Sequence, residues 1–207
     1  MRRCVVVGIT LLTLYGVGAA PAHADCAKDA EELRTHLVTE RGKARVWNIT
    51  WGALFALATG VQLVAVAAEF NPLGEFDDAY EEQLYVGAIK ATLGVGSKVV
   101  LPLKIQIPPV EADACVDVAA LRKAVARAAT KESQSIWLTI IGGTVVNLTG
   151  AIWLWARHDF KTAATSFATG VPVGPISALT QPRGSSKFYK RKRIEWVAGL
   201  GWIGGSF

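Results

Sequence analysis

The stretch that decides the fold class is residues 136–156, IWLTIIGGTVVNLTGAIWLWA, which contains no ionisable side chain. An α-helix needs about 20 predominantly apolar residues to cross the hydrocarbon core of a bilayer. Residues 47–68 form a second run without an ionisable side chain, and Trp47 and Trp51 lie at its start, where aromatic rings are typical of the lipid–water interface. We therefore expect membrane-embedded helices.

The composition of the chain agrees with lipid as its surroundings. Among 207 residues, 51% are hydrophobic and 19% are charged, which is more apolar than an ordinary soluble domain requires. The net charge of +5 does not indicate nucleic acid, because the basic residues form short clusters between apolar stretches and do not line one face. Membrane lipid is the expected partner.

Residues 1–24 have the pattern of a signal peptide. A basic start precedes an apolar run over 4–20, and Ala22-His23-Ala24 is an A-x-A cleavage site, which predicts a mature chain beginning at Asp25. The predicted destination is the bacterial cell envelope. An uncleaved anchor helix is the alternative interpretation.

Removing the signal peptide leaves two cysteines, Cys26 and Cys115. An even number of cysteines in an exported protein favours a disulfide, because the compartments outside the cytoplasm are oxidising. Two buried free thiols are the alternative.

The order of segments predicts a duplicated architecture. Trp47, Gly52, Thr59 and Gly60 each have an identical residue 90 positions later, and Cys26 lies 89 positions before Cys115. Each half has an amphipathic lead-in helix followed by two hydrophobic segments, 47–68 and 84–103 in the first half and 136–156 and 162–179 in the second. We expect an all-α membrane protein of two related helical hairpins with about four hydrophobic helices.

The predicted boundaries follow from this order. Residues 25–104 are the first repeat, the proline-rich residues 105–112 are a linker, and residues 113–182 are the second repeat. Residues 183–207 are a basic tail whose glycines and tryptophans favour a short β-like structure.

Small residues recur at intervals of four in the hydrophobic segments, and in lipid such spacing favours close helix packing. The residues concerned are Gly52, Ala56, Gly60, Gly142, Gly150, Gly170 and Gly174.

Four polar residues interrupt the same segments, namely Gln62, Lys90, Lys98 and Asn147. Interhelical hydrogen bonds would account for the two amides, and lysines can extend to the edge of the bilayer. The sharper hypothesis is a polar path between the two repeats.

The basic tail predicts contact with anionic lipid headgroups, to which each basic residue near the surface contributes about 1 kcal/mol. The residues concerned are Lys187, Lys190, Arg191, Lys192 and Arg193.

Signatures of catalysis are missing from the sequence. There is no G-x-S-x-G elbow, no Walker loop, no dinucleotide-binding glycine pattern and no zinc-ligand spacing, so we predict no catalytic residue, cofactor or metal. The acidic run 75–82 could collect a cation, but a solvated connector is the plainer interpretation. His158 and Asp159 are the one visible acid/base pair, and they define a third hypothesis, an enzyme acting on lipid.

The charges conflict with the expected topology. If the signal peptide is cleaved and four segments span the membrane, Arg157 and Lys161 are the basic residues on the inner side, and the basic clusters lie on the outer side. The positive-inside rule predicts the opposite distribution. The last segment could fail to span, the hairpins could dip into the bilayer, or the membrane could be one to which the rule does not apply.

Residues 170–182 carry the pattern Gly-x-x-x-Gly-x-x-x-Ala followed by Leu-Thr-Gln-Pro, after an apolar helix and before a basic tail with a Gly-rich aromatic end. In these features and in residues 90–102 the chain resembles a group of signal-bearing Gram-negative membrane proteins to which no activity is attached. The leading hypothesis is a non-enzymatic envelope membrane protein that acts through lipid or protein contacts, including contacts with its own copies. The alternative is a small transporter or channel component.

Overall fold

The computed structural model describes residues 19–72 and 74–192, and all regular structure in them is helical. Five helices follow one another as α1 (Ala19–Ala67), α2 (Asp78–Val100), α3 (Ala114–Arg157), α4 (Phe160–Gly170) and α5 (Val173–Thr180). Residues 184–192 are helical as well. The all-α prediction is confirmed for the described part of the chain.

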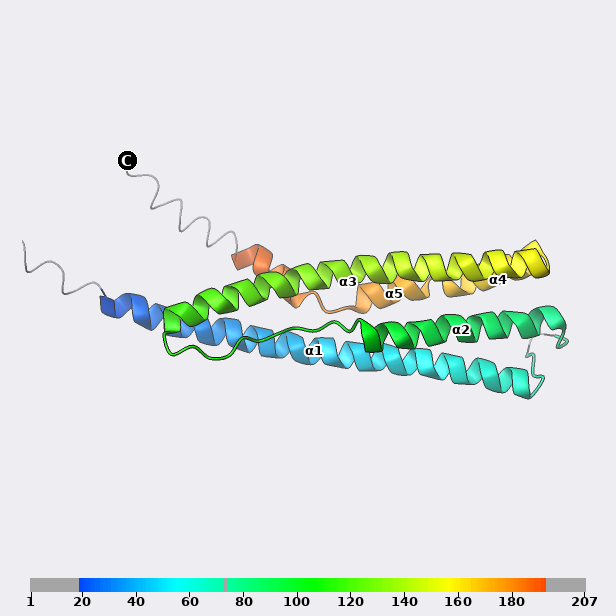
Figure 1. The fold of residues 1–207 in the computed structure, drawn as a ribbon, viewed down its shortest axis with the longest axis horizontal. Coiled ribbons are helices and arrows are strands. Elements are labelled where there is room, and N and C mark those ends of the chain that lie inside the picture. Colours follow the sequence, from blue (N-terminus) through cyan, green and yellow to red (C-terminus); the bar gives the residue numbers. More distant parts are fainter. Residues whose placement is uncertain (1–18, 73, 193–207) are drawn as a thin grey trace, which may run out of the picture.

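The helices form two hairpins that lie side by side along the long axis of the molecule (Figure 1). In the first, α1 turns back through α2, and in the second, α3 turns back through α4 and α5. Both turns lie at the same end of the molecule, which we call the tip (residues 68–82 and 157–161). The 49 residues of α1 and the 44 of α3 correspond to lengths of about 74 and 66 Å at 1.5 Å per residue.

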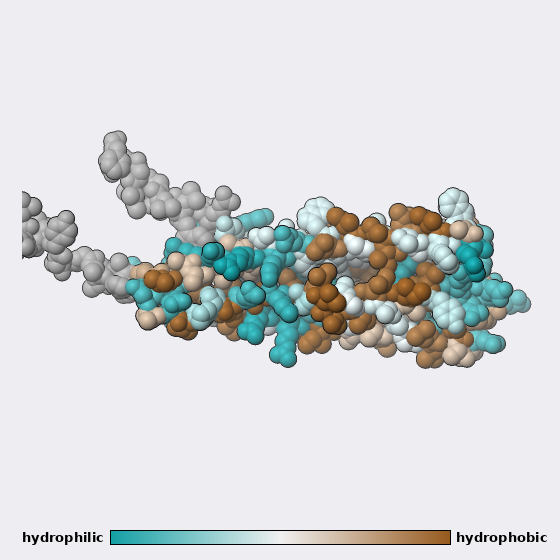
Figure 2. Space-filling view, viewed as in Figure 1, coloured by the Kyte–Doolittle hydropathy of each residue, from teal (hydrophilic) through white to brown (hydrophobic). Residues whose placement is uncertain are grey.

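The predicted lead-in helices are not separate elements, because α1 and α3 run unbroken from their charged first halves into their apolar second halves. No proline lies at either junction, 45–48 or 133–137, and no unpaired helix end is created there. We call the charged part of the molecule the stalk (residues 25–46, 103–135 and 181–192) and the rest, apart from the tip, the apolar half. Figure 2 shows this division along the molecule, with hydrophilic residues again at the tip.

The stalk has a core of its own. Leu37 of α1 and Leu121 and Val125 of α3 are completely buried, and Phe188 of the helical segment 184–192 packs against the same cluster. Burial of each such side chain contributes about 1.5–3 kcal/mol. The stalk is therefore a packed body, and its two long helices hold a fixed register.

The segment that follows α2 packs along this core. Leu103 and Ile105 are buried while Lys104 and Gln106 are exposed, the alternation expected of an extended chain lying on a surface. Asn48 fixes the start of the segment by donating to the Leu103 carbonyl at 3.0 Å and accepting from the Leu103 N–H at 3.2 Å. The proline-rich residues 105–112 are thus held against the stalk.

The second hairpin returns through two short helices. α4 ends at Gly170 and α5 begins at Val173, because Pro172 has no N–H to continue the backbone ladder, whereas Pro175 lies in the first turn of α5, where proline is tolerated. Within the described residues, α1 and α3 contain stretches long and apolar enough to cross a membrane. α2 contains no such stretch, and α4 and α5 have only 11 and 8 residues, so the predicted count of about four membrane-length helices is not reached within the described residues.

The β-like tail is not confirmed. Residues 184–192 are helical, and the remainder of the tail, with Arg193, Trp196 and Trp202, lies outside the described residues. Most of the predicted signal peptide, residues 1–18, lies outside them too.

Candidate functional site: the apolar half and its boundaries

The surface of the apolar half is formed by large aliphatic side chains. Leu57 and Val64 of α1, Val99 of α2 and Leu138 of α3 are each more than 60% exposed. None of the most apolar stretch of α1 is buried inside the molecule. A core helix of a water-soluble protein would have such a stretch covered, so this surface calls for an apolar environment.

Asn147 joins α3 to α4 inside the apolar half. Its side chain is buried and donates to the carbonyls of Gly143 at 2.9 Å and Gly170 at 3.2 Å. A Cβ at Gly170 would occupy the position of the Asn147 amide, so glycine is what admits this contact. The interhelical hydrogen bond explains Asn147 without a polar path.

Lys90 connects three helices. Its aliphatic stem leaves α2 and passes over Gly150 of α3, where a Cβ would clash with it, and its Nζ donates to Ser166 Oγ of α4 at 2.9 Å. Ser166 is buried and carries no charge. Among the described residues, no carboxylate is recorded as an ion-pair partner of this ammonium group.

Gln62 and Lys98 make different contacts. Gln62 of α1 lies against Gly87 of α2, and its Oε1 is buried without a hydrogen-bond donor among the described residues. Lys98 lies at the stalk end of α2, with its Nζ 3.8 Å from the centre of the Trp47 ring, a cation–π contact. The four polar residues are therefore distributed over separate helix contacts and are not gathered around one cavity.

Some of the small residues lie against a neighbouring helix, and others face outward. Gly174 lies against the backbone of α3 at Thr139 and Gly143, while Gly150 and Gly170 accept polar side chains. A Cβ added at Gly60 or Gly142 would meet nothing within 4 Å. Gly52 faces Lys98 at ordinary contact distance and Ala56 is exposed, so part of the small-residue pattern faces outward.

At the tip, Glu82 of α2 holds the end of α3. It accepts from Trp153 Nε1 at 2.7 Å, and His158 Nε2 and Arg157 Nε lie 2.6 and 3.3 Å from its oxygens. The hydrogen bond from Trp153 first, and then His158 and Arg157, lower the pKa of the Glu82 carboxyl.

The proposed acid/base pair at the tip is divided between two tasks. His158 faces Glu82, whereas Asp159 accepts from the Thr162 N–H at 2.8 Å and caps α4. This arrangement gives both side chains a structural role.

Two buried glutamates escaped the sequence analysis. Glu132 of α3 is completely buried and accepts from the N–H groups of Ser185 at 3.0 Å and Ser186 at 2.8 Å. Glu40 of α1 accepts from the N–H of Gly184 at 3.1 Å. Both carboxylates therefore cap the helical segment 184–192, where a helix N-terminus favours negative charge.

The Thr-Gln-Pro residues form the joint between α5 and this capped segment. Gln181 is buried, donates to the Glu132 carbonyl at 2.8 Å and accepts from Ser135 Oγ at 3.0 Å. Thr180 Oγ1 accepts from Trp51 Nε1 at 3.0 Å. The motif thus locks the second hairpin to the stalk.

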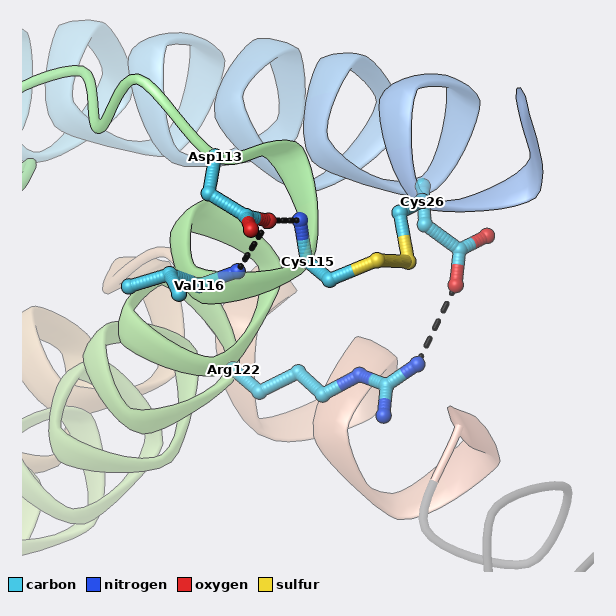
Figure 3. The surroundings of a disulfide bond; sticks show 6 residues. Cys26, Asp113, Cys115, Val116 and Arg122 are labelled. Carbon is cyan, nitrogen blue, oxygen red and sulfur yellow. Dashed lines mark hydrogen bonds and ion pairs between the residues drawn. A yellow bond between two sulfur atoms is a disulfide. The ribbon is translucent and has the colours of Figure 1, made fainter. Parts of the chain in front are cut away.

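The disulfide between Cys26 and Cys115 closes the far end of the stalk, with Cα atoms 5.1 Å apart, as the sequence predicts (Figure 3). Asp113 caps α3 beside it by accepting from the N–H groups of Cys115 and Val116. Arg122 and Asp29 form an ion pair of 3.1 Å between the same two helices.

No protein-family model, curated protein or solved structure matches this chain. We therefore argue its function from the arrangement of its own residues.

Proposed function

We propose that the chain is a non-enzymatic integral membrane protein of the bacterial cell envelope. Its apolar half is embedded in lipid and holds the disulfide-closed stalk upright at the membrane surface, where the stalk contacts lipid or protein. The observation that carries this proposal is the continuity of α1 and α3, which pass unbroken from a packed stalk into an outward-facing apolar surface.

The dimensions support insertion. Residues 136–156 of α3 rise by about 31 Å as a helix, close to the roughly 30 Å of a bilayer core. Trp47 and Trp51 of α1 and Trp137 of α3 lie at one end of the apolar half, and Trp153 and Trp155 lie at the other. Two aromatic levels are the usual arrangement at the two faces of a membrane.

The rigidity of the stalk supports a structural role. Asp117 is buried and accepts from Arg34 at 2.8 and 3.1 Å, and the same guanidinium donates to the Pro108 carbonyl at 3.0 Å. Because one arginine ties α1, α3 and the extended segment together, movement of one element would break contacts with the other two.

The disulfide determines the expected orientation. Disulfides persist in oxidising compartments, so the stalk lies on the exported side and the acidic tip on the opposite side. The exposed cations of the stalk oppose this orientation under the positive-inside rule. Labelling of the stalk and of the tip with a membrane-impermeant reagent tests this orientation.

Extraction of membranes tests the insertion. An embedded protein stays in the membrane pellet after washing with carbonate at high pH, whereas a surface-bound protein is released. We expect retention of the wild type and of a variant with the stalk cation pair neutralised, Lys28→Gln/Lys123→Gln, because neither residue contacts the apolar half. Release of the wild type into the wash would refute insertion.

The alternative, a transport function, rests on Lys90, a cation inside the apolar half whose recorded partner is an uncharged hydroxyl. Chloride efflux from proteoliposomes, compared with protein-free vesicles, discriminates the two hypotheses. If the protein is a scaffold, vesicles that contain the wild type or the Lys90→Met/Lys98→Met variant release chloride no faster than protein-free vesicles. Efflux that the substitution pair abolishes would establish the alternative.

A further inference from the structure

Exposed cations lie on several segments of the stalk directly beyond the tryptophans that mark its boundary with the apolar half. We call them the cationic belt, and its members come from four separate segments: α1, the extended segment, α3 and the helical segment 184–192. They include Arg41, Arg45, Lys104, Arg127, Lys131 and Lys187, all of them exposed.

Carboxylates at the same level are withdrawn from the surface. In the described ranges 40–46, 103–107, 127–135 and 181–190, the acidic residues are Glu40 and Glu132, at 2% and 0% exposure. Both accept from backbone N–H groups of residues 184–186, and Glu40 also pairs with Lys43 at 2.6 Å. The belt consequently presents positive charge without an exposed carboxylate at its own level.

Several cations farther from the apolar half are paired with carboxylates. Arg34 pairs with Asp117, Arg122 with Asp29 and Lys192 with Glu32. The pairing of Lys192 with Glu32 places the end of the described helical segment 184–192 beside the outer part of the stalk, so the belt draws mainly on segments other than the tail cluster that the sequence singles out. Among the described residues, no ion pair joins the six named belt cations to a carboxylate, and the concentration of such cations at one level indicates a partner there.

The level of the belt matches that of lipid headgroups. Arg45 precedes Trp47 by two residues and Lys131 precedes Trp137 by six, which places their Cα atoms about 3 and 9 Å beyond the tryptophans along each helix. The Debye length is about 8 Å at physiological ionic strength, so phosphates at the bilayer surface lie within effective range. Lysine and arginine side chains can also extend toward them.

We propose that the cationic belt binds the phosphate groups of anionic phospholipids, of the phosphatidylglycerol class, in the leaflet that the stalk faces. This inference rests on the proposed insertion of the apolar half and adds the chemical class of the lipid. Each belt cation near the surface contributes about a fivefold preference for an anionic headgroup, so that two substitutions weaken binding about thirtyfold.

Native mass spectrometry of the full chain in detergent micelles tests the proposal. The protein is titrated separately with dioleoylphosphatidylglycerol and dioleoylphosphatidylcholine, and the dissociation constants are compared. The test variant is Arg45→Gln/Lys131→Gln. The matched control is Lys28→Gln/Lys123→Gln, which removes the same charge from exposed positions farther out on the same two helices.

We expect the wild type and the control to bind phosphatidylglycerol at least tenfold more tightly than phosphatidylcholine, and the test variant to lose most of this preference. Added inorganic phosphate at millimolar concentration should not displace the lipid. Equal affinities of the wild type for the two lipids, or equal losses in both variants, would overturn the proposal. Carbonate extraction does not depend on headgroup preference. A protein that stays in the membrane pellet but shows no preference for phosphatidylglycerol would therefore refute the belt proposal and leave the proposed insertion standing.

Discussion

The disulfide between Cys26 and Cys115 allows the stability of the stalk to be worked out from the structure. The bond closes a loop between residues separated by 89 positions, and the chain-entropy relation gives about 4.6 kcal/mol for a fully flexible loop of this length. If the hairpin of α1 and α2 stays helical in the membrane when the stalk unfolds, roughly 33 residues of the loop become flexible, and the same relation gives about 3.7 kcal/mol. The two limits differ little, so the expected loss is well defined.

The perturbation is the double substitution Cys26→Ser/Cys115→Ser. If the chain unfolds as a whole, a loss of about 4 kcal/mol lowers Tm by roughly 10 °C, and unfolding of the stalk alone gives a larger shift. Thermal unfolding followed by circular dichroism in detergent measures the shift, and the reduced wild type should show the same shift as the variant. A Tm within about 2 °C of the oxidised wild type would refute the view that the bond constrains the stalk.

Three further predictions concern single contacts. Glu132→Ala leaves the Ser185 and Ser186 N–H groups without their acceptor and should lower the free energy of unfolding by about 1–3 kcal/mol, with faster hydrogen exchange at both amides. Glu111→Ala, at an exposed position, should change neither the stability nor the exchange rates. Gly170→Ala displaces the Asn147 amide and should lower the free energy of unfolding by about 1–3 kcal/mol in the wild type. In an Asn147→Ala background the same substitution should cost less than about 0.5 kcal/mol, and equal costs in the two backgrounds of this double-mutant cycle would contradict the contact. Burial lowers the pKa of His36 below 6.5 despite the nearby Glu40 and Glu132, so the folded stalk binds fewer protons than the unfolded chain near pH 6. When the pH is lowered from 7.5 to 5.5, the Tm of the wild type should therefore fall by more than the Tm of the His36→Phe variant.

The helical fold and the disulfide could be predicted because each depends on a pattern in one segment or on composition. The apolar run 136–156 is long enough to predict a helix by itself, and the two cysteines that follow the predicted signal peptide allow one pairing. The continuity of α1 and α3 was missed for a physical reason, since a change from charged to apolar residues marks a change of surroundings and does not by itself end a helix.

The contacts that connect the elements could not be predicted. Glu132 finds its partners more than 50 residues away, and Lys90 finds Ser166 at a separation of 76, so no local pattern announces either pair. The break at Pro172 was visible in the sequence, but its consequence, a return arm of two short helices opposite the unbroken α2, depends on packing against α3. The two hairpins therefore resemble each other more in α1 and α3 than in their return arms.

The hypothesis of a polar path illustrates the same limit. Gln62, Lys90, Lys98 and Asn147 share a chemical character, which the sequence shows, but they make separate contacts, which the sequence cannot show. A glycine lies opposite Gln62, Lys90 and Asn147, which explains how these polar side chains fit between helices.

Labelling of single cysteines with a membrane-impermeant maleimide shows whether the apolar half crosses the membrane and leaves the stalk on the exported side. The variants are Lys123→Cys on the stalk and Asp78→Cys at the tip, both at exposed positions, in a background that keeps the Cys26–Cys115 disulfide. We expect labelling of position 123 in cells whose outer membrane has been permeabilised and whose inner membrane is intact, and labelling of position 78 only after lysis. Labelling of both positions before lysis, or of position 78 alone, would contradict this expectation.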